Sequence, residues 1–235
     1  GIPGMVAGSV RHLLSLRSLQ ADGGWIHQLI GEAENERMHM LVYRELYQPG
    51  LLMRVAIVLS QGIMWNIFFL CYLMSPRLCH RFVGYLEEEA VKTYSGAIDM
   101  MAANGPLEKF GKRPAPQRAI QYWQLSADAN VYDMTLAVRA DEAGHRDVNH
   151  DFANQIAAHH AKAAAVEAAR AKAAECARCR RQCPAGADCA CKVAAAAAEA
   201  EKVPAASDST YSDRVRDAAA SHNAAVQRAV ASRSS

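Results

Sequence analysis

The 235-residue sequence predicts an all-α protein, and three observations support this fold class. Residues 1–155 form one helical pattern after another, broken by Pro and Gly, and no stretch alternates apolar and polar residues as a strand would. In two of these segments a Glu is followed three residues later by a His, which places both side chains on one helix face. Beyond about residue 157 the chain consists mainly of Ala, Arg, Lys, Glu and Ser, without large apolar residues at core spacing.

The change in composition divides the chain into two parts. Residues 1–155 are long enough to bury one core. Residues 156–235 form an Ala-rich extension, which we expect to be a solvated helix followed by a disordered tail. The formal net charge is only +2 and no basic stripe contains interleaved aromatic residues, so we expect no nucleic-acid partner.

Proline and glycine set the predicted helix boundaries. The end of a first helix is visible in residues 3–19. Four further helical segments cover residues 25–47, 51–74, about 77–103 and roughly 118–155. The first three of these end at Pro49-Gly50, Ser75-Pro76 and Asn104-Gly105-Pro106.

The Glu-x-x-His pairs are Glu36 with His39, in NERMH, and Glu142 with His145, in RADEAGH. On a helix, the two residues of each pair can reach one metal ion together. A surface or capping pair explains a single motif equally well, because a short motif often occurs by chance. Two pairs, each inside an apolar helix, indicate a metal site more strongly.

The stretch LEEEAV, residues 86–91, adds carboxylates on a third helix with apolar flanks. Three consecutive Glu point in three directions, so at least one faces the bundle interior, where an unpartnered carboxylate is costly. Periodicity does not show which one it is. Di-iron carboxylate bundles combine two Glu-x-x-His motifs with a single Glu from each of two other helices. The sequence therefore predicts a ferritin-like four-helix bundle that carries a di-iron carboxylate site.

At these residues the sequence resembles the alternative oxidases, which are membrane-bound di-iron quinol oxidases. The matching stretches, in chain order, are PGMVAG, GGWI, NERMH, LEEEAVKTY, YWQLSADA and RADEAGHRDVNH. The resemblance covers roughly residues 1–155 and is closer to the mitochondrial type than to the plastid quinol oxidases, whose helix motifs differ from NERMH and LEEEA. Between Glu142 and His145 the family usually carries Ala-His. This chain has Ala143-Gly144 there, which loosens the helix by about 1 kcal/mol.

The resemblance implies two iron ions and assigns their ligands. These are Glu36, His39, Glu87, Glu142 and His145. It selects Glu87 from the three consecutive glutamates, a choice that periodicity cannot make. The family has a fourth Glu six residues before the proline that matches Pro3, and Asp22 and Glu32 lie too far along the chain to replace it. We therefore expect an N-terminally truncated chain whose first helix is incomplete. Its cluster of three Glu and two His should open beside residues 1–10, bind iron poorly and show no oxidase activity.

The resemblance also implies roles for residues near the metals. The redox-active tyrosine of the family falls on Tyr94, and two helical turns place it on the same face as Glu87. A core aromatic with a satisfied hydroxyl is the alternative interpretation of Tyr94. The quinol pocket of the family matches four residues for which ordinary helix surface is the alternative: Leu86, Glu89, Ala90 and Thr93. Asp141 and Asn35, next to ligands in the sequence, are candidates for orienting the imidazoles.

The implied activity is oxidation of ubiquinol by dioxygen, which is reduced to water, without inhibition by cyanide and without proton pumping. The expected location is the matrix side of the mitochondrial inner membrane, and the expected partners are membrane lipid and a second copy of the chain in a homodimer. A plastid-type quinol oxidase, another di-iron carboxylate bundle protein and a metal-free helical membrane protein are the alternatives.

Residues 51–74 are nearly all apolar, and about 20 such residues suffice to cross a bilayer. A crossing would put Glu36 and His39, which precede this segment, on the opposite side of the membrane from Glu87, which follows it. We therefore expect a monotopic helix that lies in the membrane interface, with Arg54 at one end. A buried core helix is the alternative.

Five cysteines lie between Cys176 and Cys191, with the spacing C-x2-C-x3-C-x5-C-x-C. This density is typical of a metal site, but the paired spacing of known zinc sites is missing. A zinc knuckle and a redox-sensitive tail remain open, and we expect that the cluster binds nothing specific.

Overall fold

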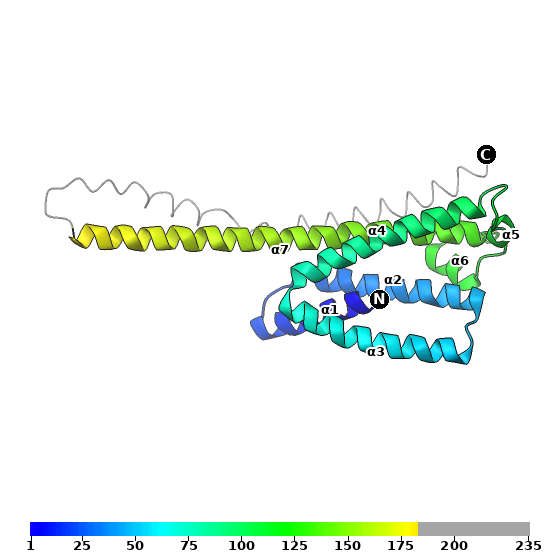
Figure 1. Ribbon diagram of the computed structural model, residues 1–235, viewed down its shortest axis with the longest axis horizontal. Coiled ribbons are helices and arrows are strands. Elements are labelled where there is room, and N and C mark those ends of the chain that lie inside the picture. Colours follow the sequence, from blue (N-terminus) through cyan, green and yellow to red (C-terminus); the bar gives the residue numbers. More distant parts are fainter. Residues whose placement is uncertain (183–235) are drawn as a thin grey trace.

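The computed structural model describes residues 1–182. Within this range the regular structure consists of seven helices and one isolated β-bridge, between Pro114 and Asn130 (Figure 1). The helices are α1 (Ile2–Ser18), α2 (Trp25–Tyr47), α3 (Leu51–Met74), α4 (Pro76–Met101), α5 (Glu108–Gly111), α6 (Gln117–Trp123) and α7 (Val131–Gln182). The prediction of an all-α fold is confirmed.

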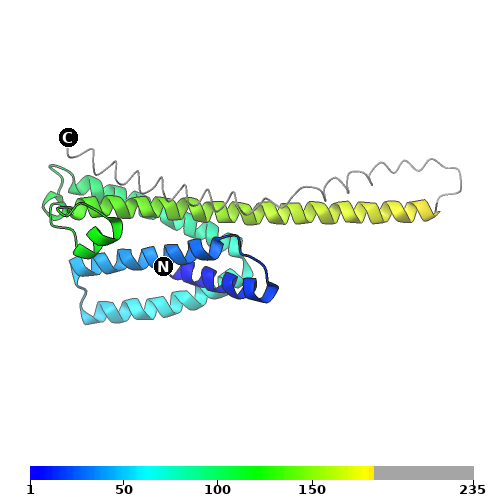
Figure 2. The ribbon, with the colours of Figure 1, turned by 180° about the vertical axis from the view of Figure 1, so that it is seen from behind.

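Helices α4 and α7 pack side by side, and α1, α2 and α3 lie together on one side of them (Figures 1 and 2). Helix α1 contacts α2, α3 and α4, whereas α3 lies at the outer edge in both views. Helix α7 continues as a single rod well beyond the other helices. The arrangement is a bundle of α1, α2, α4 and α7 with α3 added outside it.

Two separate apolar clusters fill the bundle. One joins the second half of α2, the end of α4, α6 and the start of α7, and includes Val42, Met101 and Val131. The other joins α1, the first turns of α2, the end of α3 and the start of α4 to Phe152 of α7. Helices α2, α4 and α7 each run from one cluster to the other. The residues of these three helices that lie between the two clusters therefore face one another and form a separate layer, called the central layer of the bundle.

Stacking of Trp25 on Phe152 ties the start of α2 to α7. The two ring centroids lie 3.9 Å apart, and the guanidinium of Arg11 lies over the Trp25 ring, 4.0 Å from its centroid. Arg11 also forms an ion pair with Asp22 at 2.6 Å, and Asp22 accepts a hydrogen bond from the backbone N–H of Ile26 at 2.7 Å. These contacts fix the direction in which α2 crosses the bundle.

The prediction of one core helix over residues 118–155 is wrong. Helix α6 ends at Trp123, where Gln124 takes a left-handed conformation with φ of 51°, and α7 begins only at Val131. Asn130 and Asp133 start α7 by capping each other, since the backbone N–H of each donates to the other's side chain at 3.1 Å. By contrast, α2 and α3 begin and end where predicted, and α4 does so within two residues.

Helix α7 also continues past the predicted domain boundary at residue 155. Its last buried residues are Phe152 and Ala153, and the described side chains after them are exposed or half-buried. Residues 183–235 and the side chains of Cys176 and Cys179 lie outside the described residues. The predicted tail and the cysteine cluster lie there with them.

Helix α3 is the one helix of residues 1–182 that is long and apolar enough to cross a membrane. Only 11% of its most apolar window is buried, and its two buried residues, Phe68 and Tyr72, lie near its C-terminal end. The alternative of a buried core helix therefore does not describe α3. A continuous exposed apolar surface of this kind marks a site of contact with lipid or protein.

Candidate metal centre

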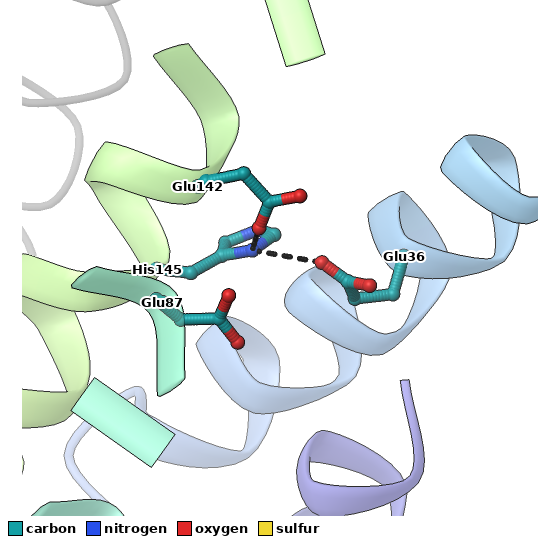
Figure 3. A group of neighbouring side chains, drawn as sticks. All are labelled: Glu36, Glu87, Glu142 and His145. Atoms are coloured by element: carbon teal, nitrogen blue, oxygen red, sulfur yellow. Dashed lines mark ion pairs between the residues drawn. The ribbon is translucent and has the colours of Figure 1, made fainter. Parts of the chain in front are cut away.

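Helices α2, α4 and α7 bring Glu and His side chains together in the layer between the two apolar clusters (Figure 3). Helix α2 contributes Glu36, α4 contributes Glu87, and α7 contributes Glu142 and His145. One potential ligand atom of each lies within 4.8 Å of those of the other three. His39, one turn after Glu36, points its Nδ1 at Glu142 across 3.2 Å. The structure thus brings all five predicted ligands together.

The two Glu-x-x-His turns face each other almost symmetrically. Nδ1 of His39 lies 3.4 Å from Glu36 Oε1 and 3.2 Å from Glu142 Oε1. Nδ1 of His145 lies 3.2 Å from Glu36 Oε1 and 3.6 Å from Glu142 Oε2, the two contacts drawn in Figure 3. Each imidazole therefore presents the same nitrogen to the same two carboxylates, one from its own helix and one from the facing helix.

The outer nitrogen of His39 is held by Asp141. Its Nε2 lies 3.0 Å from Asp141 Oδ2, which also accepts hydrogen bonds from Asn35 Nδ2 at 2.7 Å and from Trp123 Nε1 at 2.8 Å. A carboxylate behind a ligand imidazole fixes the orientation of the ring and makes it a stronger ligand. Trp123 is the last residue of α6. Because the helical path breaks between α6 and α7, its indole can turn back and donate to Asp141 of α7.

The surroundings of His145 are different. Asn149 Nδ2, one turn later on α7, donates to the His145 backbone carbonyl at 2.9 Å and to Glu32 Oε2 at 3.0 Å. On its other side, Asn149 Oδ1 accepts from His80 Nδ1 at 2.9 Å, and the Tyr72 hydroxyl donates to His80 Nε2 at 3.1 Å. Burial lowers the pKa of His80 to about 4, which keeps that imidazole neutral. A series of buried hydrogen bonds thus connects the His145 backbone carbonyl to Tyr72 of α3 through Asn149 and His80.

Mutual pairing decides which groups of the layer are charged. Burial opposes charge on His39, but Asp141, Glu142 and Glu36 outweigh it and raise the pKa of His39 to about 11. Burial is likewise outweighed at His145, where Glu142 and Glu36 raise the pKa to about 10. The two imidazoles in turn hold the pKa of Glu36 and of Glu142 below the ordinary value, against the effect of burial.

Glu87 behaves in the opposite way. Burial, and then the neighbouring charges of Glu142 and Glu36, raise the pKa of Glu87 to about 8. At neutral pH and without metal, the five convergent side chains are therefore two imidazolium ions, two carboxylates and one carboxylic acid, and the charges of these five groups cancel. Metal ligands must be deprotonated, and a bound metal would displace the protons of His39, His145 and Glu87.

Buried atoms without hydrogen bonds gather in this layer. Glu36 Oε1, His39 Nδ1 and Glu142 Oε2 are buried and have no hydrogen-bond partner, although they face one another. Such atoms are rare in folded proteins, and a cation between them would satisfy all three. Carboxylate oxygen combined with imidazole nitrogen suits iron or manganese. The residues present therefore fit an iron centre.

Tyr94 lies two turns after Glu87 on α4, and its ring stacks on Tyr43 of α2 with centroids 6.0 Å apart. Burial, Tyr43 and the charges of Glu142 and Glu36 hold the pKa of Tyr94 well above its ordinary value, so the phenol is protonated. The Tyr43 hydroxyl is buried without a hydrogen-bond partner. Tyr43 follows Glu36 by seven residues, as Tyr94 follows Glu87, so the same spacing could have identified it from the sequence.

The four residues matched to a quinol pocket lie along one side of α4. Leu86, Glu89 and Thr93 are exposed and Ala90 is half-buried. Glu89 pairs with Lys92 at 2.6 Å, and the Thr93 hydroxyl donates to the Glu89 backbone carbonyl at 2.8 Å. The structure places this stripe on the surface, beside the helix face that carries Glu87 and Tyr94.

Four residues around the layer were not predicted in these roles: Glu32, His80, Trp123 and Asn149. Glu32 lies one turn before Glu36, and Asn149 lies one turn after His145, so helical spacing contained a signal for both. Glu32 stays outside the set of four convergent ligand atoms. Trp123 approaches from a separate helix, and no spacing along one helix could have identified it.

Comparison with known proteins assigns these residues to a family. The family model described as "Alternative oxidase" matches residues 1–154. The chain belongs to the alternative oxidase family. The matched range runs from α1 to the last buried turn of α7 and contains all five convergent residues. The resemblance found in the sequence is confirmed.

Three relatives show the extent of the similarity. The chain is 54% identical over 154 residues to the mitochondrial alternative oxidase of Cryptococcus neoformans var. grubii, covering 66% of this chain and 38% of that protein. It is 54% identical over 155 residues to the mitochondrial alternative oxidase of Aspergillus niger, covering 66% and 44%. It is 50% identical over 159 residues to the mitochondrial ubiquinol oxidase of Batrachochytrium dendrobatidis, covering 67% and 49%. The chain thus spans less than half the length of these relatives.

Proposed function

We propose that this chain forms the metal-binding part of a ubiquinol:oxygen oxidoreductase that reduces dioxygen to water at a non-haem di-iron centre. The observation that carries the proposal is the convergence of two facing Glu-x-x-His turns with Glu87. The relatives' names, alternative oxidase and ubiquinol oxidase, support ubiquinol as the electron donor. Because the chain spans less than half of their length, the activity is proposed for the chain together with the segments that lie outside the match.

The five convergent residues would hold the iron ions, which when bound supply the electrons that reduce dioxygen. They are Glu36, His39, Glu87, Glu142 and His145. The chain's other residues prepare this site. Asp141 turns Nδ1 of His39 toward the centre, and the apolar clusters on either side of the layer exclude bulk water. The activity is expected to resist cyanide and to pump no protons.

Tyr94 and the stripe on α4 would serve quinol oxidation. Because the pKa of Tyr94 is raised, its phenol keeps its proton at physiological pH, and its oxidation must release that proton together with the electron. Leu86, Glu89, Ala90 and Thr93 would contact the quinol beside Glu87 and Tyr94. Changing Tyr94 to Phe should retain iron and ring packing but remove most quinol oxidation. Normal turnover in that variant would reduce Tyr94 to a packing residue.

The proposed location is the matrix side of the mitochondrial inner membrane, since the relatives are named mitochondrial. Helix α3 would lie in the membrane interface with its exposed apolar side in lipid. It does not cross the bilayer, because the helices before and after it converge on one site. The exposed apolar residues Met5, Leu13 and Leu16 of α1 favour a homodimer. Labelling from each face of a vesicle should find residues 45–50 and 76–80 on the same side.

Oxygen uptake with a ubiquinol donor, with and without cyanide, tests the proposed activity. The protein to use is this chain combined with the segments of the Aspergillus niger relative that lie outside the match, because the chain alone spans 44% of that protein. We expect cyanide-insensitive uptake that is absent in the Glu142→Ala variant. Iron binding without quinol-dependent uptake would favour another di-iron bundle protein. Failure to bind iron would favour a metal-free helical protein.

A further inference from the structure

The imidazole of His150 on α7 lies directly against the backbone of α4. A Cβ at position 84 would stand only 2.6 Å from His150 Nδ1 and Cε1, which is too close for atoms that are not bonded to each other. Gly84 therefore leaves the space that the ring fills. The ring of Tyr85 packs edge-on against it, with centroids 5.1 Å apart. The side chain of His150 is 19% exposed, so most of the ring is enclosed between the two helices.

Two charged residues of α4, seven positions apart, hold this ring by its two nitrogens. Arg81 Nη1 donates to His150 Nδ1 at 2.7 Å, and because a guanidinium can only donate, Nδ1 is the acceptor. The ring proton is then on Nε2, which donates to Glu88 Oε1 at 3.0 Å. Arg81 Nη2 in turn donates to Asn154 of α7. The position and the tautomer of His150 are thus fixed by two successive turns of one face of α4.

The contact distinguishes the three consecutive glutamates of α4, which are equivalent by periodicity. Glu88 pairs with His150, and Glu89 pairs with Lys92 on the surface at 2.6 Å. Glu87 is left to converge with the ligand atoms of the other helices (Figure 3). Successive residues of a helix point about 100° apart, so holding Glu88 at His150 also sets the direction of Glu87.

We propose that His150 is a positioning residue that fixes the rotation of α4 about its axis, so that Glu87 rather than Glu88 faces the metal centre. The proposal rests on the metal centre proposed above. His150 lies five residues after His145, so the same stretch of α7 supplies one ligand and directs the ligand of the neighbouring helix. A residue that only packs α4 against α7 would change the stability and leave the iron affinity of the folded protein unchanged.

Anaerobic titration with ferrous iron and urea unfolding, measured on the same variants, separate positioning from packing. The protein is the chain combined with the segments of the Aspergillus niger relative that lie outside the match. His150→Leu removes both hydrogen bonds and should weaken iron binding by about 10- to 100-fold, the range typical of groups that orient a ligand. His150→Gln offers an acceptor to Arg81 and a donor to Glu88, and should restore most of the affinity. The matched variant His159→Leu, at an exposed position of α7, should bind iron normally.

A second variant changes the same contact from α4 and keeps the test decisive if His150→Leu does not fold. Gly84→Ala places a methyl group where the ring lies, and should weaken iron binding by about tenfold or more. Its matched control is Gly96→Ala on the same helix, where a Cβ meets no atom within 4 Å. This control should bind iron as the wild type does.

The outcomes distinguish the role of His150 from the metal centre itself. Lower stability in urea, combined with wild-type iron affinity in folded His150→Leu or in Gly84→Ala, would show that His150 only packs the helices and would overturn the proposal. Equal loss of affinity in His150→Gln and His150→Leu would overturn it as well, since the two hydrogen bonds would then not matter. Failure of the wild type to bind iron would instead overturn the proposed metal centre.

Discussion

The candidate metal centre has two halves, the Glu36–His39 turn of α2 and the Glu142–His145 turn of α7. Both offer one carboxylate and one imidazole, but the groups behind the two imidazoles differ. The α2 half has Asp141 behind His39, a carboxylate that Asn35 and Trp123 hold in place. Behind His145, the α7 half has the neutral amide of Asn149, which in turn holds Glu32. Burial raises the pKa of Glu32 to about 7.

This difference shows that equal ligand spacing does not give equal support. The imidazole of His39 has a direct charged anchor, whereas His145 is steadied through its backbone carbonyl and a carboxyl group that is only partly ionised near neutral pH. We therefore expect the α2 half to hold its ligand more rigidly.

The largest effect is expected for Glu142→Ala, because Glu142 faces both imidazoles and its loss damages both halves at once. In the chain combined with the segments of the Aspergillus niger relative outside the match, iron binding should be abolished while the helical content stays nearly unchanged, as measured by iron analysis and circular dichroism. The matched variant Glu34→Ala removes an exposed carboxylate of α2 that pairs with Arg37, and it should bind iron normally. Full iron content in the Glu142 variant would contradict the assignment.

A comparison of Asp141→Asn with Glu32→Gln tests the asymmetry directly. Loss of the carboxylate behind His39 should weaken metal binding by about 10- to 100-fold, the range typical of groups that orient a ligand. Loss of the Glu32 carboxylate should cost about threefold or less, since Glu32 bonds to Asn149 rather than to the His145 ring and acts on that imidazole only through its partial charge. Metal titration of both variants gives the two values. Equal losses would show that the two halves are supported alike.

The pH dependence of the metal-free protein tests the charge pattern. The pKa values of His39 and His145 are raised from 6.5 to about 11 and about 10, so their stabilisation is complete below pH 6.5 and is lost as the pH rises through those values. The raised pKa of Glu87 acts in the same direction, because the cost of ionising it grows between its ordinary value of 4.5 and about 8.

The stability measured by urea unfolding in the presence of a chelator should therefore fall from pH 6.5 to pH 10. Iron affinity should rise over the same interval, since the imidazoles must lose their protons to bind it. The double variant His39→Gln, His145→Gln should show a flatter stability curve. A wild-type stability that stays constant or rises above pH 6.5 would contradict the proposed pairing.

The smallest effect concerns Gly144, which lies between Glu142 and His145 in the α7 half. A Cβ at this position would meet no atom within 4 Å, so Ala fits without strain. Gly144→Ala should stabilise the protein by about 1 kcal/mol, visible as a rise of a few degrees in Tm, because Ala loses less backbone entropy in a helix. Destabilisation would mean that this turn needs the flexibility of glycine.

The sequence predicted helices most accurately where Pro and Gly end them, as at Pro49-Gly50 and Ser75-Pro76. It failed at residues 124–130, because the break there depends on a left-handed Gln124 rather than on a glycine or proline. The reciprocal caps of Asn130 and Asp133 were the overlooked signal for the start of α7.

The residues of the candidate site were likewise predictable only where a local sequence signal marks them. Residues that share one helix turn, such as Glu36 with His39, could be read from spacing alone. Glu87 could not be separated from its two neighbouring glutamates by periodicity, and only the resemblance selected it. Trp123 and His80 reach the layer through tertiary contacts, which spacing along one helix does not encode.

Anaerobic titration with ferrous iron tests the di-iron centre most directly, in the chain combined with the segments of the Aspergillus niger relative that lie outside the match. The double variant His39→Ala, His145→Ala is compared with the matched variant His159→Ala, His160→Ala, which removes two exposed histidines farther along α7. We expect two iron ions per chain in the wild type and in the matched variant, and loss of tight iron binding in the double variant. Two tightly bound iron ions in the variant without His39 and His145 would contradict it.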